Sequence, residues 1–463
     1  MDSLRRFFNL EQHGTTVGTE VRGGVITFMA MVYILIVNPS ILSASGMPAD
    51  AVFVATAIAS GVATILMGIY AKLPFALAPG MGLNAYFAYS ICLGLGKSWQ
   101  FALTCVLIEG VIFIVLSLTG VREAIFRAIP QSLRYGVSIG IGLFIAFIGL
   151  INAKIVVPSA ATTVAHYDFA SNIATFNSEG ITVMLAILGI IITGILIYKK
   201  VPGNLLWGIL GTWIVGMICQ ALGLYQPNPE LGAYSLFPNF SGGITGISAV
   251  TQTLFQFEFS AIATGEFWFA VFAFLFVDIF DTLGTLTGCA IQGEMLDEEG
   301  NLPNMKQALM TDALGTTLGS CLGTSTVTTF VESSTGISAG ARTGLSAVVT
   351  GILFLMSLLL SPIFLAIPSF ATAPALVLVG FFMLQSSASQ VDWKDPSEGI
   401  PAFLTLIMMV LAYSIATGIA WGFVSYVGIN LVVKYVFKKE KQLSPVMIVL
   451  AVLFIVKFAF FPV

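Results

Sequence analysis

Charged residues are scarce in this chain of 463 residues: they make up 9% of it, whereas 57% of the residues are hydrophobic. An ordinary soluble protein is roughly one quarter charged. The chain therefore lacks the polar side chains needed to cover a surface that faces water. This excludes a soluble enzyme, a nucleic-acid-binding protein and a disordered scaffold, and we expect no nucleic acid partner. The composition fits a polytopic membrane protein surrounded by the lipid bilayer.

Histidine and paired cysteines are also nearly absent. The two histidines, His13 and His166, lie outside the apolar runs, and the five cysteines occur singly, without a CxxC pair. Metal and haem sites need several such ligands together, and a disulfide framework needs cysteines in pairs. We therefore expect no metal, no cofactor and no disulfide framework. An intramembrane enzyme is disfavoured for the same reason, because the apolar runs offer no histidine as a base.

The apolar runs predict the membrane-spanning segments. In the first half of the chain they cover 22–44, 50–70, 75–94, 99–119, 130–152, 179–198 and 204–224. After a polar stretch at 225–262, further runs cover 264–288, 306–322, 325–338, 341–367, 373–388 and 400–437. The last run is too long for one helix across a bilayer, so we expect a break near Ala416 to divide it. This predicts fourteen spans in an all-α protein, with 445–461 as either an extra span or a helix on the membrane surface.

Basic residues predict the orientation. They precede the first span (Arg5, Arg6, Arg22), separate the fourth from the fifth (Arg122, Arg127, Arg134) and follow the sixth (Lys199, Lys200), whereas 225–262 has none. This places the N-terminus in the cytoplasm and 225–262 outside, and we expect a multi-pass protein of a bacterial-type cytoplasmic (inner) membrane. Because seven is odd, two halves of seven spans enter the membrane with opposite polarity, which predicts a seven-plus-seven inverted repeat.

Five acidic residues lie inside the apolar runs: Glu109, Asp278, Asp281, Asp312 and Glu332. A charge at the bilayer centre costs about 2.5–3.5 kcal/mol on insertion scales. Each acid is therefore either protonated and holds helices together, or faces a wet cavity and binds a ligand. Asp278 and Asp281 are three residues apart, so on a helix they share one face, which Thr285 continues. Two neighbouring carboxyls can take up and release a proton. We expect Glu109 and Asp312 to be structural hydrogen-bond partners.

Two spans are rich in Gly, Ser, Thr or Pro where a plain helix should be apolar, the third span (78–90) and the tenth (323–336). Each is expected to be broken into a short extended segment and a half-helix, whose first N–H groups could meet a polar ligand. In the third span Gly80 and Gly82 allow close approach, and Asn84 would open the half-helix. In the tenth span the half-helix would begin near Thr328, with Glu332 and Ser333 within it.

The same stretches carry a resemblance to a known family. HGTT (13–16), TFMAMVYILIVNP (27–39), ALAPGMGLNAYFAY (76–89), FVDIFDTLGTLTG (276–288) and TTFVESSTGISAGARTGL (328–345) resemble the AzgA-like purine permeases of the nucleobase–cation symporter-2 family. The resemblance implies a core domain (1–119 and 263–370), a gate domain (120–262 and 371–463) and a homodimer joined through the gate domains. It also implies that Asn84, Asp278 and Glu332 contact the substrate and that Asp281 is a further acid essential to transport.

Together these observations predict a purine uptake transporter, with guanine or hypoxanthine as substrate and the proton as coupling ion. Either Asp281 or Asp278 would carry the proton, because coupled carboxyls titrate as a pair. An adenine-preferring permease of the same family stays open. An anion carrier of the same architecture is less favoured, since the membrane midplane is acidic. A channel is less favoured too, because broken spans suit alternating access.

Overall fold

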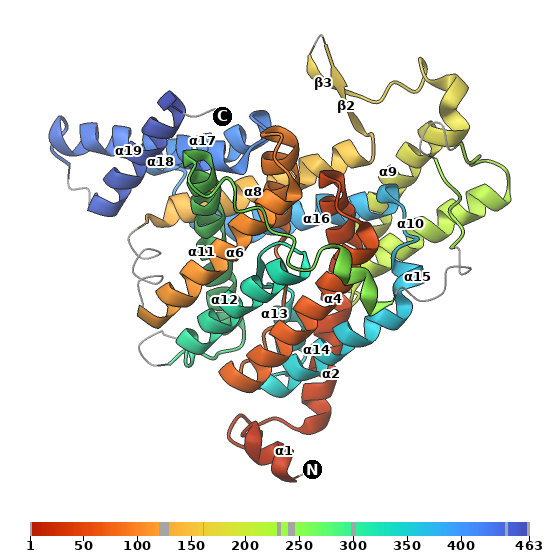
Figure 1. Ribbon diagram of the computed structural model, residues 1–463, viewed down its shortest axis with the longest axis horizontal. Coiled ribbons are helices and arrows are strands. Elements are labelled where there is room, and N and C mark those ends of the chain that lie inside the picture. Colours follow the sequence, from red (N-terminus) through yellow and green to blue (C-terminus); the bar gives the residue numbers. More distant parts are fainter. Residues whose placement is uncertain are drawn as a thin grey trace.

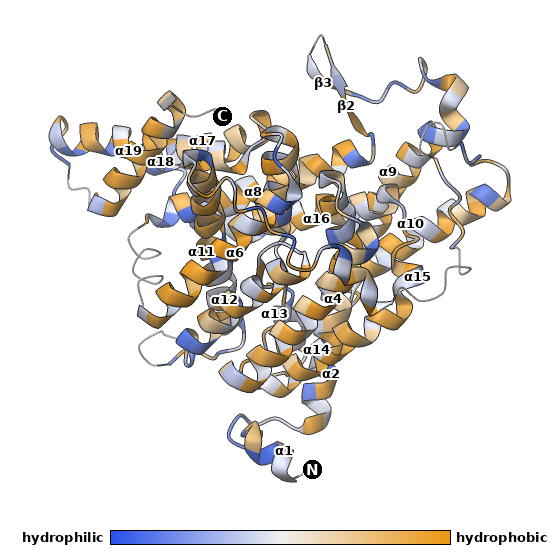
Figure 2. Cartoon of the chain, viewed as in Figure 1, coloured by the Kyte–Doolittle hydropathy of each residue, from blue (hydrophilic) through white to orange (hydrophobic). Residues whose placement is uncertain are grey.

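Helices dominate the computed structural model, which describes residues 2–119, 129–160, 162–228, 233–238, 246–297, 302–439 and 443–460 (Figure 1). Arg122 and Arg127 lie outside this part of the chain. Ten helical segments within it are long and apolar enough to cross a membrane: Val17–Ser45, Ala49–Ala71, Trp99–Thr119, Gln131–Asn152, Ile173–Tyr198, Asn204–Ala221, Gly265–Gln292, Gly344–Phe364, Ser369–Gln390 and Ile415–Tyr435. The protein is thus mostly helical and polytopic. Hydrophobic residues cover most of these helices (Figure 2).

One group of helices packs around the two interrupted segments. It contains α2 (Val17–Met31), α3 (Ile34–Leu42), α4 (Ala49–Leu66), α6 (Trp99–Thr119), α11 (Gly265–Gln292), α12 (Met305–Leu322) and α14 (Gly344–Met356). Helix α12 packs on α6 and α4, α14 packs on α4 and α2, and α11 packs on α6. Helices from the two halves of the sequence are therefore interleaved, as α2, α4 and α14 show in the lower part of Figure 1.

A second group of helices packs beside the first. It contains α8 (Gln131–Asn152), α9 (Ile181–Tyr198), α10 (Asn204–Ala221), α16 (Ser369–Ser387), α17 (Pro396–Leu411), α18 (Ile415–Tyr435) and α19 (Pro445–Phe460). Helix α8 packs on α16 and α17, and α9 packs on α10 and α16. The backbones of α8 and α16 meet closely at Gly142, where a Cβ would lie 2.9 Å from the carbonyl oxygen of Gly380. Small residues permit such close helix contacts in membranes.

The long run at 400–437 is divided into α17 and α18 by the turn at 412–414, slightly before Ala416. Tyr413 has a left-handed backbone with φ of 51°, and the Ser414 side chain caps α18 by accepting from the Thr417 N–H. An N-cap hydroxyl satisfies an N–H that has no partner within the helix. Helix α19, in the segment whose position the sequence left open, packs on α18.

Two segments leave the helical pattern. The first consists of β1 (Leu77–Pro79), α5 (Met81–Ala85) and the π-helix η3 (Tyr86–Gly94), and the second of β4 (Val327–Thr329) and α13 (Ser333–Ser338). Strands β1 and β4 pair antiparallel, with Ala78 opposite Thr328. The predicted start of a half-helix at Thr328 was wrong, because the β-branched run Val327–Thr329 is paired as a strand and α13 begins at Ser333. Asn84 does not open α5 either, since Gly80 occupies the N-cap.

Four of the fourteen predicted spans have no counterpart among the ten long apolar helices of the described residues. Two predicted spans are the strand-and-helix segments, which contain no long helix. Helix α12 is 18 residues long but holds several polar residues, and α17 has 16 residues.

The remaining described elements are short: α1 (Asp2–Phe7), η1 (Ser43–Ser45), η2 (Met67–Ala71), β2 (Val156–Ser159), β3 (Thr163–His166), η4 (Ile173–Thr175), η5 (Phe176–Gly180), η7 (Ile247–Gln252), η8 (Ser357–Leu360), α15 (Ser361–Phe364) and η9 (Ala388–Gln390).

Candidate substrate site at the strand crossing

The crossing of β1 and β4 is fixed by hydrogen bonds from its surroundings. The N–H of Gly80 donates to the carbonyl of Thr326 at 3.0 Å, and that of Phe330 donates to the carbonyl of Ala76 at 3.0 Å. The hydroxyl of Ser333 accepts from the N–H of Ala76 at 3.0 Å. Irregular backbone at membrane depth is tolerated only where its polar groups are satisfied by protein or a wet cavity. The Ser333 hydroxyl, predicted as a supporting group, thus holds the residue that precedes β1.

The Thr282 hydroxyl lies at the centre of one group of acids. Its oxygen is 2.8 Å from Oδ1 of Asp278, 3.0 Å from Oδ1 of Asp312 and 2.6 Å from the hydroxyl of Thr328. A threonine hydroxyl has one proton, so it can donate to only one of these three oxygens at a time. Helix α11, helix α12 and strand β4 therefore meet at a single shared hydroxyl.

Asp281 and Glu332 form the neighbouring part of the cluster. The hydroxyl of Tyr33 donates to Oε1 of Glu332 at 2.6 Å. The Asp281 carboxyl lies against Gly80, since a Cβ built there would be 3.3 Å from its Oδ2. Asp281 also interacts electrostatically with Asp312 and Glu332. Two of the carboxyls therefore approach the strand crossing from different elements, one on α11 and one just after β4.

The remaining polar residues hold the segment that leads into β4. The hydroxyl of Ser325 donates to the side-chain oxygen of Asn84, and the amide of Asn84 donates to the carbonyl of Pro79 at 3.4 Å. The hydroxyl of Thr326 donates to Oε2 of Glu109 at 2.6 Å. Glu109 thus accepts a hydrogen bond from the structure around the site, and Asp312 lies within hydrogen-bonding distance of Thr282.

The polar residues of the cluster differ in how far they are buried. The side chains of Asn84, Glu109, Asp278, Asp312 and Thr328 are fully buried, whereas Asp281, Thr285 and Glu332 are partly exposed. A buried carboxyl must be paired or neutral, because an isolated charge is costly away from water. Asp281 and Glu332 are therefore less enclosed than Asp278 and Asp312.

The structure thus brings Asn84, Asp278, Asp281 and Glu332 to one place, around a crossing of segments that are about 250 residues apart in the sequence. Gly80 and Thr328 lie in the crossing, whereas Gly82 faces Ile141 of α8, where a Cβ would be 2.6 Å from Cγ2. Four contributors were not singled out from the sequence: Tyr33, Thr282, Ser325 and Thr326. Tyr33 and Thr282 lie in two of the motifs that carry the family resemblance, and this was the one sequence feature that could have pointed to them.

The arrangement suits an uncharged polar ligand. Carboxylates accept hydrogen bonds from N–H groups, and protonated carboxyls donate one. The sequence segments 75–95, 267–292 and 307–341 contain no lysine or arginine. An anionic ligand would therefore meet acids from these segments and no countercharge. The site can accept N–H donors and can hold protons.

Solved structures with a similar fold are membrane transport proteins. The transmembrane domain of a cyanobacterial bicarbonate transporter, BicA, aligns with a TM-score of 0.62 at 15% identity, covering 86% of this chain and 97% of that one. The anion transporter SLC26A9 aligns with a TM-score of 0.62 at 13% identity, covering 92% of this chain and 66% of that one. At such identity the likeness shows the fold alone. The chain is a multi-pass membrane protein of this transporter fold.

Sequence comparison gives the family. The model Xan_ur_permease, which describes a permease family, matches residues 18–421. The chain therefore belongs to the nucleobase–cation symporter-2 family of permeases, whose members are transport proteins rather than enzymes.

Relatives match along nearly the whole chain. A putative permease of Methanocaldococcus jannaschii is 46% identical, covering 99% of both chains. The guanine/hypoxanthine permease PbuG of Bacillus subtilis is 41% identical, covering 99% of this chain and all of that one (100%). The adenine permease AdeP of Escherichia coli is 39% identical, covering 99% and 96%.

Proposed function

We propose that this permease takes up guanine and hypoxanthine together with protons by alternating access. The observation that supports this most is the position of Asp281 and Glu332, two partly exposed carboxyls beside one strand crossing. Both purines present N–H groups that carboxylates accept. A relative described as a guanine/hypoxanthine permease, at 41% identity over the full length, agrees with this substrate class.

The burial of the acids favours separate roles. We assign substrate contact to Glu332 and Asp281, which are partly exposed, and the coupling proton to Asp278, which is buried and shares Thr282 with Asp312. This exchanges the roles that the family resemblance implied for Asp278 and Asp281. Asn84, also buried, would shape the site through Ser325 rather than touch the base.

The accessible face of α11 supports an inward-facing state. Below Asp281 that face continues through Gly284, Thr285 and Gly288 to Gln292, all partly or fully exposed. A Cβ on Gly284 or Gly288 would meet nothing within 4 Å. The basic residues predict that this end of α11 faces the cytoplasm. The site would therefore communicate with the cytoplasm here.

The transport cycle would move two bodies. We propose that the core (1–119 and 263–370) shifts against the gate (120–262 and 371–463), in a fourteen-span inverted repeat with a cytoplasmic N-terminus. The close contact between Gly82 and Ile141 lies on the boundary between α5 and α8 along which that shift would occur. The homodimer through the gate domains belongs to the same proposal, as does a bacterial-type cytoplasmic membrane.

Competition for uptake tests the substrate. Purified protein in liposomes would take up labelled hypoxanthine, and unlabelled guanine, adenine, xanthine and uracil would be added with and without a protonophore. We expect guanine to compete best and the protonophore to abolish accumulation. Competition by adenine alone would identify the adenine-preferring alternative. Accumulation that the protonophore does not reduce would refute proton coupling.

An anion carrier is the second candidate, because the similar solved structures include a bicarbonate transporter. The chemistry of the site argues against it, since five acids and no lysine or arginine lie in the segments 75–95, 267–292 and 307–341 together with α6. Bicarbonate in excess should therefore leave hypoxanthine uptake unchanged. A steady ionic current without any purine would instead favour a channel.

A further inference from the structure

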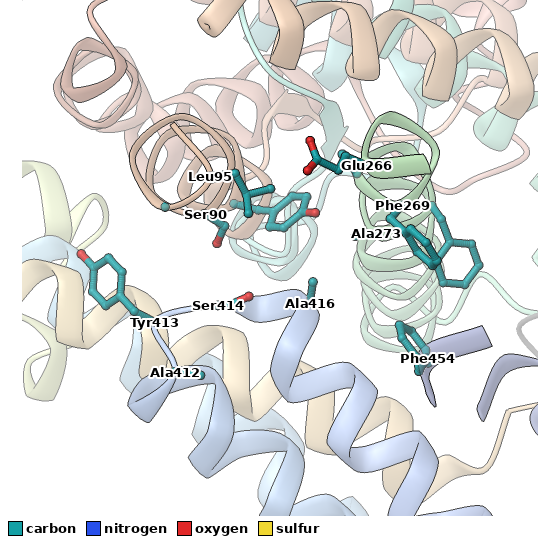
Figure 3. A pocket seen from close by; sticks show the side chains of 14 residues that line it. Ser90, Leu95, Glu266, Phe269, Ala273, Ala412, Tyr413, Ser414, Ala416 and Phe454 are labelled. Carbon is teal, nitrogen blue, oxygen red and sulfur yellow. The ribbon is translucent and has the colours of Figure 1, made fainter. Parts of the chain in front are cut away.

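A cavity lies beside the N-terminal half of α11, away from the exposed face near Gln292. It measures about 100 Å³ and lies between η3, α11, the turn at 412–414 and α19. Figure 3 shows Ser90, Glu266, Ala273 and Ser414 around this space, contributed by three different elements. These elements belong to both helix groups, so the cavity lies where the two groups meet.

The cavity and the acid cluster share one face of α11. Glu266, Ala270 and Ala273 line the cavity, and Val277 and Asp281 continue their row at spacings of three and four residues, which keeps them on one face. From Ala273 to Asp281 the helix rises roughly 12 Å, at about 1.5 Å per residue. Val277 is buried between them. The cavity thus lies along the same face of α11 as Asp281, with Val277 between them on the helix.

One polar group in the cavity wall has no partner. The Ser90 side chain is 8% exposed, and its hydroxyl has no hydrogen-bond partner among the described residues. A buried hydroxyl without a partner is unfavourable, so its position needs a reason. A ligand that hydrogen-bonds there when the cavity is occupied supplies one.

The other wall groups suit a flat heterocycle. Tyr86 and Phe454 provide aromatic surface, and the Ser414 oxygen and the Glu266 carboxylate provide polar contacts. Glu266 is paired with Lys97 at 2.5 Å, which fixes it at the rim. Tyr413 contacts the rings of Phe144 and Tyr89, at 5.2 and 6.0 Å between centroids. Its ring thereby anchors the turn that presents Ser414.

From this geometry we infer that the cavity is a second binding site for the planar base, occupied on the outer side before the base reaches the acid cluster. This rests on the proposed function. A cavity of ~150 Å³ can hold benzene, so at about 100 Å³ the cavity is contracted. It must widen to admit a bicyclic base, which a movement between the two helix groups would allow.

Uptake kinetics give the first test. Ser90→Ala removes a ligand hydrogen bond, so the hypoxanthine concentration for half-maximal uptake should rise about 2- to 10-fold with the maximal rate retained. Ser60→Ala is the matched control, because the Ser60 hydroxyl is also buried and without a partner but lies in α4, outside the cavity. Equal kinetics for Ser90→Ala and Ser60→Ala would overturn the inference.

Cysteine labelling separates this site from the acid cluster. Ala412→Cys places a thiol at an exposed position that lines the cavity, and Ala221→Cys places one at an exposed position on α10 outside it. We expect saturating hypoxanthine to slow maleimide labelling at Ala412→Cys at least threefold in purified protein, and not at Ala221→Cys. Protein without an introduced cysteine gives the background.

The same labelling is repeated with Glu332→Gln, or with Asp281→Asn if that variant does not fold. Protection that persists while uptake is lost supports a separate outer site. Protection that disappears with the acid-cluster variant, or is absent although wild-type protein takes up hypoxanthine, overturns the outer site and leaves the proposed function standing. Absence of both protection and uptake in wild-type protein refutes the proposed function itself.

Discussion

The hydroxyl of Tyr33 donates a 2.6 Å hydrogen bond to the carboxyl of Glu332, although the two residues are 299 positions apart in the sequence. Tyr33 lies between α2 and α3, and Glu332 immediately precedes α13. A helix pair from the first half of the chain thereby orients an acid from the second half. The carboxyl that we assign to substrate contact is held by a residue outside its own segment.

Replacing this tyrosine tests that relationship. Tyr33→Phe removes the donor and leaves the ring, and a hydrogen bond to a charged group contributes about 1.5–3 kcal/mol. We expect kcat/KM for hypoxanthine uptake to fall about tenfold or more, with the protein still folded. Tyr198→Phe, at a tyrosine that is 88% exposed, is the control. Unchanged uptake by Tyr33→Phe would show that Glu332 does not depend on this donor.

Gly80 leaves no space for a side chain at the crossing. A Cβ there would lie 2.8 Å from Cγ2 of Thr328 and 3.3 Å from the Asp281 carboxyl. Gly80→Ala should therefore displace β4 or Asp281 and abolish uptake. Gly194→Ala in α9, where a Cβ meets nothing within 4 Å, should behave as wild type. Radiolabelled uptake with a melting curve for each variant distinguishes loss of the site from loss of the fold.

Substitution of the two aspartates of α11, Asp278 and Asp281, should impair different parts of transport. Asp278→Asn can no longer give up a proton, so accumulation against a gradient should be lost while exchange of labelled for unlabelled purine continues. Asp281→Asn removes a proposed substrate contact, so both accumulation and exchange should be lost. The opposite result, with exchange surviving only in Asp281→Asn, would restore the roles implied by the family resemblance.

Thr282 connects three elements through one hydroxyl, so the hydroxyl rather than the side-chain size should matter. Thr282→Ser keeps the group that contacts Asp278, Asp312 and Thr328, and it should retain most of the accumulation. Thr282→Val keeps the shape but removes the hydroxyl, and the dependence of uptake on pH should change. Identical pH profiles for Thr282→Val and Thr282→Ser would remove Thr282 from the coupling proposal.

Much of the membrane character follows from the sequence, because a polar residue in an apolar run is costly and therefore conspicuous. The cost of burial singled out Asp278, Asp281 and Glu332, and the abundance of Gly, Ser and Thr singled out the segments that form β1 and β4. Local patterns could not show that Ala78 pairs with Thr328, since strand pairing depends on how distant segments pack. For the same reason the helix was expected to start at Thr328 instead of Ser333.

Tyr33 and Ser325 show that sequence patterns do not identify a residue whose role depends on a distant partner. A tyrosine in an apolar run reads as an ordinary packing residue, and its donor role appears only when Glu332 is placed beside it. Ser325 likewise gains its role from the position of Asn84. The burial that separates Asp278 from Asp281, three residues along one helix, also depends on the neighbouring helices and not on the spacing.

Uptake of labelled hypoxanthine into liposomes with an imposed inward proton gradient, compared between wild-type protein and folded Glu332→Gln, tests the central claim most directly. We predict that wild-type protein accumulates the purine until a protonophore is added and that the variant, still monodisperse, accumulates none. Accumulation by Glu332→Gln at the wild-type rate would contradict the assignment of this strand crossing as the purine site.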